Sequence, residues 1–98
     1  MSQARYSEEA EAEFLAEVGF YKEVQVQGAD KFHAAVKEAT ARALSFPRAG
    51  TPYFANTRRV FVKGYPFFLV YVLEPDGIAV VAVVHEARRP GYWLSRVP

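Results

Sequence analysis

The chain has 98 residues, of which 51% are hydrophobic and 15% aromatic, so it can fold around one modest core as a single domain over residues 1–98, and an intrinsically disordered chain is excluded. The absence of cysteine excludes disulfide bonds and thiolate metal sites. The net charge of +1 combines an acidic half, with six basic and eight acidic side chains in residues 1–50, and a basic half. Proteins that track nucleic-acid phosphate usually carry a larger basic excess.

The sequence gives no sign of a secretory or membrane-spanning segment. Residues 1–5 run straight into an acidic stretch and lack the apolar core of a signal peptide. The longest apolar run, residues 78–84, is far shorter than the ~20 residues that a membrane helix needs. We therefore expect a cytoplasmic protein with no membrane partner.

The first part of the chain predicts a short strand and a helix. Residues 2–6 form the candidate strand, and Ser7 is a good N-cap because its hydroxyl can accept a hydrogen bond from the first helical turn. The helix should end before Gly28, and its glutamates, Glu13 among them, are expected mostly on the solvated side. Helical spacing predicts a buried face made of Phe14, Leu15, Val18 and Tyr21.

A second helix is expected to begin at Asp30, which is a common capping residue. It should end at residues 46–47, because the residue before a proline avoids the helical region. Residues 48–52 then form a loop. The inner face of this helix is predicted to consist of Phe32, Val36, Ala39, Ala43 and Leu44.

The second half of the chain predicts three strands, at residues 57–63, 67–73 and 78–85. Tight turns at residues 64–66 and 74–77 join them, because proline and glycine suit the dihedral angles of such turns. Short connections of this kind produce an antiparallel meander.

The pattern within these strands predicts how the sheet is covered. Val60 and Val62 alternate with Arg59 and Phe61, so the two pairs should face opposite sides. The next two strands are almost wholly apolar. This indicates central strands covered on both faces, or one face hidden by the helices and the other by a partner.

The order of elements is therefore β-α-α-β-β-β, which predicts an α+β fold of two layers with the helical hairpin on one face of the meander. After the last strand, Pro90 can open a short helical turn that carries Tyr92, Trp93 and Arg96.

Four stretches, in this order, resemble the RelE/ParE toxin superfamily, and the ParE-like branch most closely. Residues 6–10 open the first helix, and residues 44–50 hold a leucine, a proline and a glycine after the second. Residues 59–71 contain a strand, a proline–aromatic turn and a strand ending in Val-Tyr. Residues 83–96 hold a histidine, then Arg-Arg-Pro, then Tyr-Trp and an arginine, as in ParE-like plasmid stabilisation proteins.

This resemblance implies a RelE/ParE-like fold and the toxin of a bacterial type II toxin–antitoxin system. RelE-type members cut messenger RNA in the ribosomal A site, whereas ParE-type members block DNA gyrase by protein–protein contact. Members of both types are held inactive by an antitoxin that wraps the toxin with a helix and an extended segment. The expected partners are a cognate antitoxin, in a hetero-oligomer with the toxin, and DNA gyrase; the alternative target is the ribosome with its mRNA.

Residue identities at the ribonuclease positions separate these two activities. RNA cleavage next to a 2′-hydroxyl needs a base, cations and an acid. In register with residues 69–71, the two strand lysines of the ribonuclease pattern fall on Arg59 and Phe61, and the arginine of the next strand falls on Phe68. An aromatic ring can neither accept a proton nor neutralise a phosphorane, so the pattern favours a gyrase inhibitor over an enzyme.

The remaining candidates then form a surface for binding the target rather than a catalytic centre. Only a ribonuclease would use His85, Arg88 and Tyr92 as catalytic groups, since histidine is a common general acid or base in enzymes. The commonest role of a histidine at this position is a hydrogen bond that anchors the C-terminal segment. Tyr92 and Trp93 are expected to be core residues that cap the open end of the sheet, and their alternative role is that of an exposed anchor for a protein partner. The predicted target-binding residues are Arg58, Arg59, His85, Arg88, Arg89, Tyr92, Trp93 and Arg96.

The sequence predicts no metal site and no cofactor. Its two histidines, His33 and His85, lie in different elements without ligand spacing around them, and no glycine-rich phosphate loop is present. A third interpretation is a family member that binds an antitoxin but poisons nothing. Because the strands are so apolar, we also expect the chain to self-associate without its antitoxin.

Overall fold

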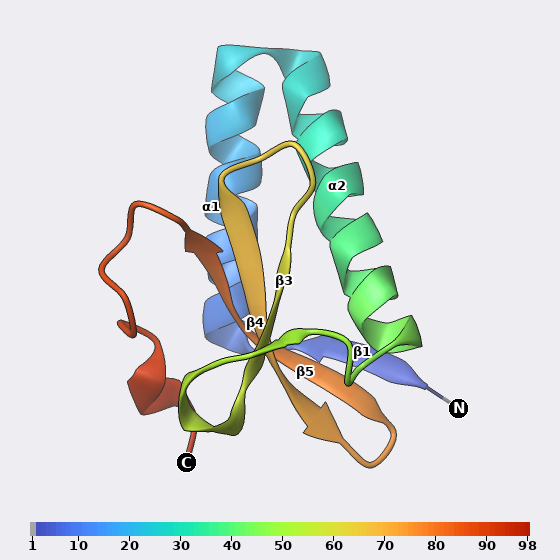
Figure 1. The fold of residues 1–98 in the computed structure, drawn as a ribbon. Helices are drawn as coiled ribbons and strands as arrows, with labels where there is room; N and C mark the ends of the chain where they lie inside the picture. Colours follow the sequence, from blue (N-terminus) through green and yellow to red (C-terminus); the bar gives the residue numbers. More distant parts are fainter. Residues whose placement is uncertain (1) are drawn as a thin grey trace.

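The computed structural model, which describes residues 2–98, consists of a five-stranded sheet with two long helices on one face (Figure 1). The strand order is β1-β5-β4-β3-β2, in which β1 is parallel to β5 and the other neighbours are antiparallel. The predicted α+β fold is therefore confirmed. The elements are β1 (Gln3–Tyr6), α1 (Glu8–Val24), α2 (Val26–Ser45), β2 (Thr51–Pro52), the 3-10 helix η1 (Phe54–Asn56), β3 (Arg58–Phe61), β4 (Phe67–Glu74), β5 (Gly77–His85) and the 3-10 helix η2 (Leu94–Arg96).

The helix boundaries agree with the sequence at Ser7 and differ at Asp30. The Ser7 hydroxyl accepts from the amide of Ala10 at 3.1 Å, as predicted for an N-cap. Asp30 does not cap α2, which already begins after the single connecting residue Gln25. The first turn of α2 buries Ala29, so tertiary packing extends the helix beyond the boundary that capping preference suggests.

The helix-covered face is closed by an aromatic cluster centred on Phe32, which is 0% exposed. The Phe32 ring stacks on Tyr21 at 4.7 Å between centroids and meets Tyr65 and Phe67 edge-on at 5.2 and 5.3 Å. Leu15 was expected on this buried face but is 57% exposed. It follows Phe14 directly, so the helical rotation between neighbours turns it away from the sheet.

A β-bulge in β5 sets the inward and outward positions of the sheet. Val70 pairs with Ala82, but the next residue, Tyr71, pairs with Val80, which leaves Val81 without a partner. The alternation therefore shifts by one residue at Val81. Residues on both sides of the bulge still alternate between the two faces, and Val83 contacts the same core cluster as Val80.

The other face of the sheet is covered by the C-terminal segment, residues 86–98. Trp93 is buried in a second cluster with Phe68, Val70, Val81, Ala82 and Val84. Both faces of the two apolar strands are thus covered, as the sequence indicated. No helix within residues 2–98 combines the length and the apolar composition needed to cross a membrane.

Candidate functional site

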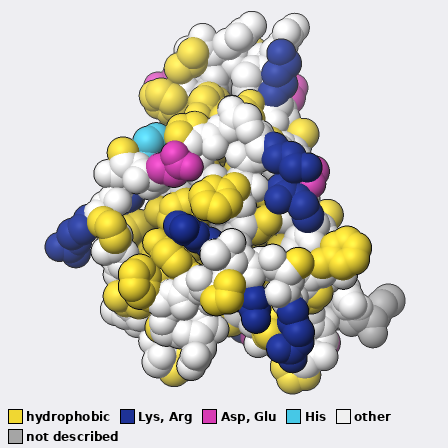
Figure 2. All heavy atoms as spheres, viewed as in Figure 1, with side chains coloured by type: hydrophobic (Ala, Val, Ile, Leu, Met, Phe, Trp, Pro, Cys, Tyr) yellow, Lys and Arg dark blue, Asp and Glu magenta, His cyan; other side chains and the backbone are white. Residues whose placement is uncertain are grey.

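A cavity of about 320 Å³ lies between the sheet and the C-terminal segment. Figure 2 looks onto this side of the molecule and shows hydrophobic side chains gathered around a basic one. Three of the predicted binding residues, Arg59, Arg88 and Trp93, line this cavity. We call it the aromatic cavity; its other lining residues are Tyr53, Phe61, Phe68, Val84, Glu86, Pro90 and Gly91.

Arg59 is the central charged group of the aromatic cavity. Its guanidinium carbon lies 4.5 Å from the ring centroid of Tyr53, 5.0 Å from that of Phe61 and 5.2 Å from that of Phe68. Cation–π attraction of this kind stabilises the charge without using its N–H groups. The Nε atom is buried and has no hydrogen-bond partner among residues 2–98.

Tyr53 was not singled out in the sequence, and its position depends on a tight turn through η1. Ala55 and Asn56 both adopt left-handed backbone conformations, with φ of 58° and 60°, and asparagine tolerates this region better than most residues. The Thr57 hydroxyl donates to the carbonyl of Phe54 at 2.6 Å and closes the turn. Tyr53 can then stack on Trp93, with 5.6 Å between centroids.

The turn follows β2, residues 51–52, a short edge strand that was predicted as part of a loop. Two residues are too few to show a strand pattern in the sequence. Their pairing with Arg58 and Arg59 on β3 brings the preceding segment back onto the sheet. The structure therefore completes the site through a strand that periodicity cannot detect.

Arg58 lies outside the aromatic cavity and has a structural role. It donates from Nη1 to the carbonyls of Arg48 and Gly50, at 2.8 and 2.7 Å, and so fixes the segment between α2 and β2. The hydroxyl of Tyr71 donates to the Pro47 carbonyl in the same segment at 2.7 Å. A side chain at position 50 would have its Cβ 2.1 Å from that hydroxyl, so this position requires glycine.

Glu13 anchors the C-terminal segment to β5. The edge of β5 that pairs with β1 up to Val80 has no neighbouring strand after that residue, and we call this part the free edge of β5. Its carboxylate accepts from the Val83 amide at 3.0 Å, from the Tyr92 hydroxyl at 2.5 Å and from both terminal nitrogens of Arg96 at 2.9 and 3.1 Å. Arg96 also donates to the carbonyl of Val81, the bulge residue, at 3.0 Å. The expectation that Glu13 is solvated is wrong. The pairing of β5 with β1 ends at Val80, and Glu13 accepts hydrogen bonds from the Val83 amide further along β5 and from the C-terminal segment.

We call these residues the Glu13 cluster; it comprises Glu13, Tyr92, Arg96 and Val83. The cluster raises the pKa values of Tyr92 and Arg96. Burial, followed by the hydrogen bond to Glu13, raises the pKa of the Tyr92 hydroxyl well above its ordinary value. The hydrogen bond to Glu13 raises the pKa of Arg96. Tyr92 therefore stays protonated as a donor at neutral pH, and Arg96 is already neutralised by its ion pair.

The histidine and the two neighbouring arginines have different environments. His85 accepts from the Ala87 amide at Nδ1 and packs edge-on against Phe67, so it anchors the turn after β5. The guanidinium of Arg88 lies 4.0 Å from the Tyr92 ring centroid and lines the aromatic cavity. Arg89 is exposed and does not line the cavity.

Trp93 is 1% exposed, as expected for a core residue and not for an exposed anchor that binds a partner. Its indole closes the floor of the aromatic cavity instead. The site can therefore bind an anionic or aromatic group through Arg59, Arg88 and the surrounding rings. At the ribonuclease positions, Phe61 and Phe68 hold Arg59 and offer no group for proton transfer.

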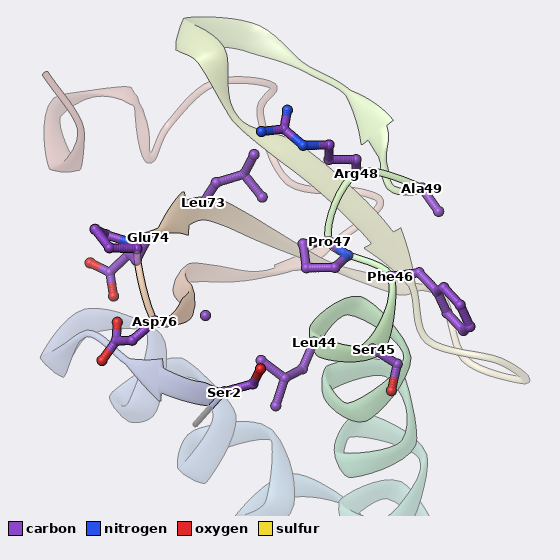
Figure 3. A pocket seen from close by; sticks show the side chains of 12 residues that line it. Ser2, Leu44, Ser45, Phe46, Pro47, Arg48, Ala49, Leu73, Glu74 and Asp76 are labelled. Atoms are coloured by element: carbon purple, nitrogen blue, oxygen red, sulfur yellow. The ribbon is translucent and has the colours of Figure 1, made fainter.

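A larger cavity of about 740 Å³ lies where α2 ends beside the β4–β5 turn (Figure 3). Leu44, Pro47 and Leu73 line it, while the ring of Phe46 points away from it. None of the eight predicted binding residues lines this cavity. The aromatic cavity is therefore the better candidate site, although it is smaller.

The fold is that of a solved structure described as the chromosomal ParDE toxin–antitoxin system from P. aeruginosa, with a TM-score of 0.74 and 17% sequence identity over 87% of this chain and 96% of that chain. A family model for the ParE toxin of the type II toxin–antitoxin system parDE matches residues 4–90. The chain belongs to this ParE toxin family. A search of curated protein sequences finds no match.

Proposed function

We propose that this chain is a toxin that inhibits DNA gyrase by protein–protein contact in the cytoplasm and is neutralised by a cognate antitoxin. Membership of the ParE toxin family supports the pairing with an antitoxin. The observation that carries the choice of target is the packing of Arg59 between Phe61 and Phe68. Two ribonuclease positions are thereby filled by rings that cannot transfer a proton.

The remaining candidate catalytic groups also favour binding. Nδ1 of His85 is occupied by the amide of Ala87. The Tyr92 hydroxyl is bound to Glu13, and its raised pKa makes it a poor acid or base at neutral pH. Arg88 remains as a cation on the surface of the site, where arginine is a common interface residue.

The antitoxin is proposed to cover the helical hairpin. Apolar side chains are exposed on α1 and at the start of α2, and large apolar patches mark sites of protein association. We expect the isolated chain to self-associate at high concentration in analytical ultracentrifugation, whereas a monodisperse monomer would contradict this prediction. The exposed residues where α1 ends and α2 begins are Phe20, Val24 and Val26, whereas Leu15 is exposed on the other flank of α1.

The target is tested by inducing the chain without antitoxin in a bacterial host and pulse-labelling DNA and protein synthesis. Gyrase inhibition predicts that DNA synthesis fails first, and that the purified chain blocks supercoiling by purified gyrase. Translation that stops first, with mRNA cut in the ribosome, would show a ribonuclease. Failure of neither process would show a chain that poisons nothing.

Substitution of His85 by glutamine distinguishes the two mechanisms further. Loss of a general acid or base from a nuclease removes nearly all activity. A binding surface spreads its affinity over several residues, so we expect the His85→Gln chain to keep most of its toxicity.

A further inference from the structure

Arg59 differs from the other well-anchored arginines of this protein. Arg5, Arg42 and Arg96 each pair with a carboxylate, and Arg58 donates to two backbone carbonyls. The side chain of Arg59 has no such anchor among residues 2 to 98, because its Nε is buried without a hydrogen-bond partner. The three surrounding rings stabilise its charge, and its Nε–H group is left without an acceptor.

This is an incomplete site for a planar anion. A guanidinium is planar, and its N–H groups form a fork that matches the two oxygens of a carboxylate. The rings shield part of the guanidinium from water, so an ion pair formed there is stronger than one on an open surface.

The local charges favour a single carboxylate over a nucleic-acid backbone. Arg59 and Arg88 contribute two positive charges to the cavity lining, and Glu86 contributes one negative charge. Arg58 is engaged with carbonyls and Arg96 with Glu13, and Arg89 does not line the cavity. The cavity volume of about 320 Å³ is at the small end for ligand pockets and suits one side chain.

We infer that the aromatic cavity is a socket for one acidic side chain, aspartate or glutamate, from a protein partner. The carboxylate is received by the guanidinium of Arg59, with Arg88 at the rim. The inference depends on the geometry of this chain alone and not on gyrase being the target. A result against it therefore leaves the proposed function standing, and the reverse also holds.

The experiment is an NMR titration of the full chain that follows the Nε–Hε signal of Arg59. The probe is a tripeptide with blocked ends and a central glutamate, and its matched control has glutamine at that position. We expect a saturable shift of the Arg59 signal with the glutamate peptide and at least tenfold weaker binding of the glutamine peptide. No shift, equal shifts with both peptides, or a shift only with inorganic phosphate or a single-stranded oligonucleotide would overturn the inference.

A variant tests the same point from the side of the protein. Arg59→Lys keeps the charge but removes the planar guanidinium, so binding of the glutamate peptide should weaken at least tenfold. Arg48→Lys, at an exposed residue that does not line the cavity, should bind like the parent chain. Retained binding in Arg59→Lys would overturn the inference; if this variant does not fold, the titration of the parent chain still decides.

Discussion

The two faces of the sheet are closed in different ways. On one face, α1 and α2 bury an aromatic cluster around Phe32 through apolar contacts between neighbouring elements. On the other, the C-terminal segment buries Trp93 and is held by the polar Glu13 cluster across the free edge of β5. The helix-covered face supplies the stability of the fold, whereas the second face builds the site and depends on a few directional contacts.

This difference predicts the largest effect for Phe32→Ala. Phe32 is fully buried and touches four aromatic rings, and truncation of such a residue costs about 3–5 kcal/mol. That is a large part of the ~5–15 kcal/mol that stabilises a typical domain. Urea unfolding should show a strongly lowered midpoint or an unfolded chain.

The matched control for this variant is Phe46→Ala, because Phe46 is 67% exposed at the end of α2. It should unfold close to the parent chain. Equal losses of stability in the two variants would mean that the helix-covered cluster is not the main source of stability.

The same difference explains how far the sequence predicts this protein. The hairpin and the meander were predictable because helical spacing and tight turns are local signals. The Glu13 cluster joins residues up to 83 positions apart, so no local pattern reports it. One signal was present: Glu13 lies three residues after Ala10 and one before Phe14, on the border of the buried face.

The site was predicted only in part for a related reason. Arg59, Phe61 and Phe68 could be placed on one face from strand alternation and register. Tyr53 could not, because it depends on the two-residue strand β2 and on the left-handed turn at Ala55 and Asn56. Of the predicted arginines, the structure brings Arg59 and Arg88 to the cavity and gives Arg58 and Arg96 structural contacts.

The second face should respond to Glu13→Gln with an intermediate loss. The variant keeps an oxygen acceptor but removes the charge that pairs with Arg96, in a cluster whose two ionic side chains are only 17% and 18% exposed. Between the values for exposed and buried pairs, we expect a loss of about 2 kcal/mol. Trp93 is the only tryptophan, so a red shift of its emission reports loosening of the C-terminal segment directly.

Glu11→Gln is the matched control, since Glu11 is an exposed residue of the same helix. Its emission and unfolding midpoint should equal those of the parent chain. If Glu13→Gln also left both unchanged, the Glu13 cluster would not be what holds the second face.

The smallest effect is expected for Tyr92→Phe, and it depends on pH. At pH 8 the variant loses one hydrogen bond to Glu13, worth about 1 kcal/mol. In the parent chain the pKa of Tyr92 is raised on folding. Above the ordinary tyrosine value of about 10, the unfolded chain therefore releases this proton before the folded chain does, and the stability of the parent falls as pH rises further.

The Tyr92→Phe chain lacks this loss, so the stability difference between the two proteins should shrink from pH 8 to pH 11. Tyr6, Tyr21 and Tyr71 also have raised pKa values, but both proteins contain them, and their contributions cancel in the difference. Urea unfolding at several pH values measures the effect. Parallel stability curves would show that the Tyr92 hydroxyl is not held by Glu13, and the second face would then rest on the Glu13–Arg96 ion pair and the burial of Trp93.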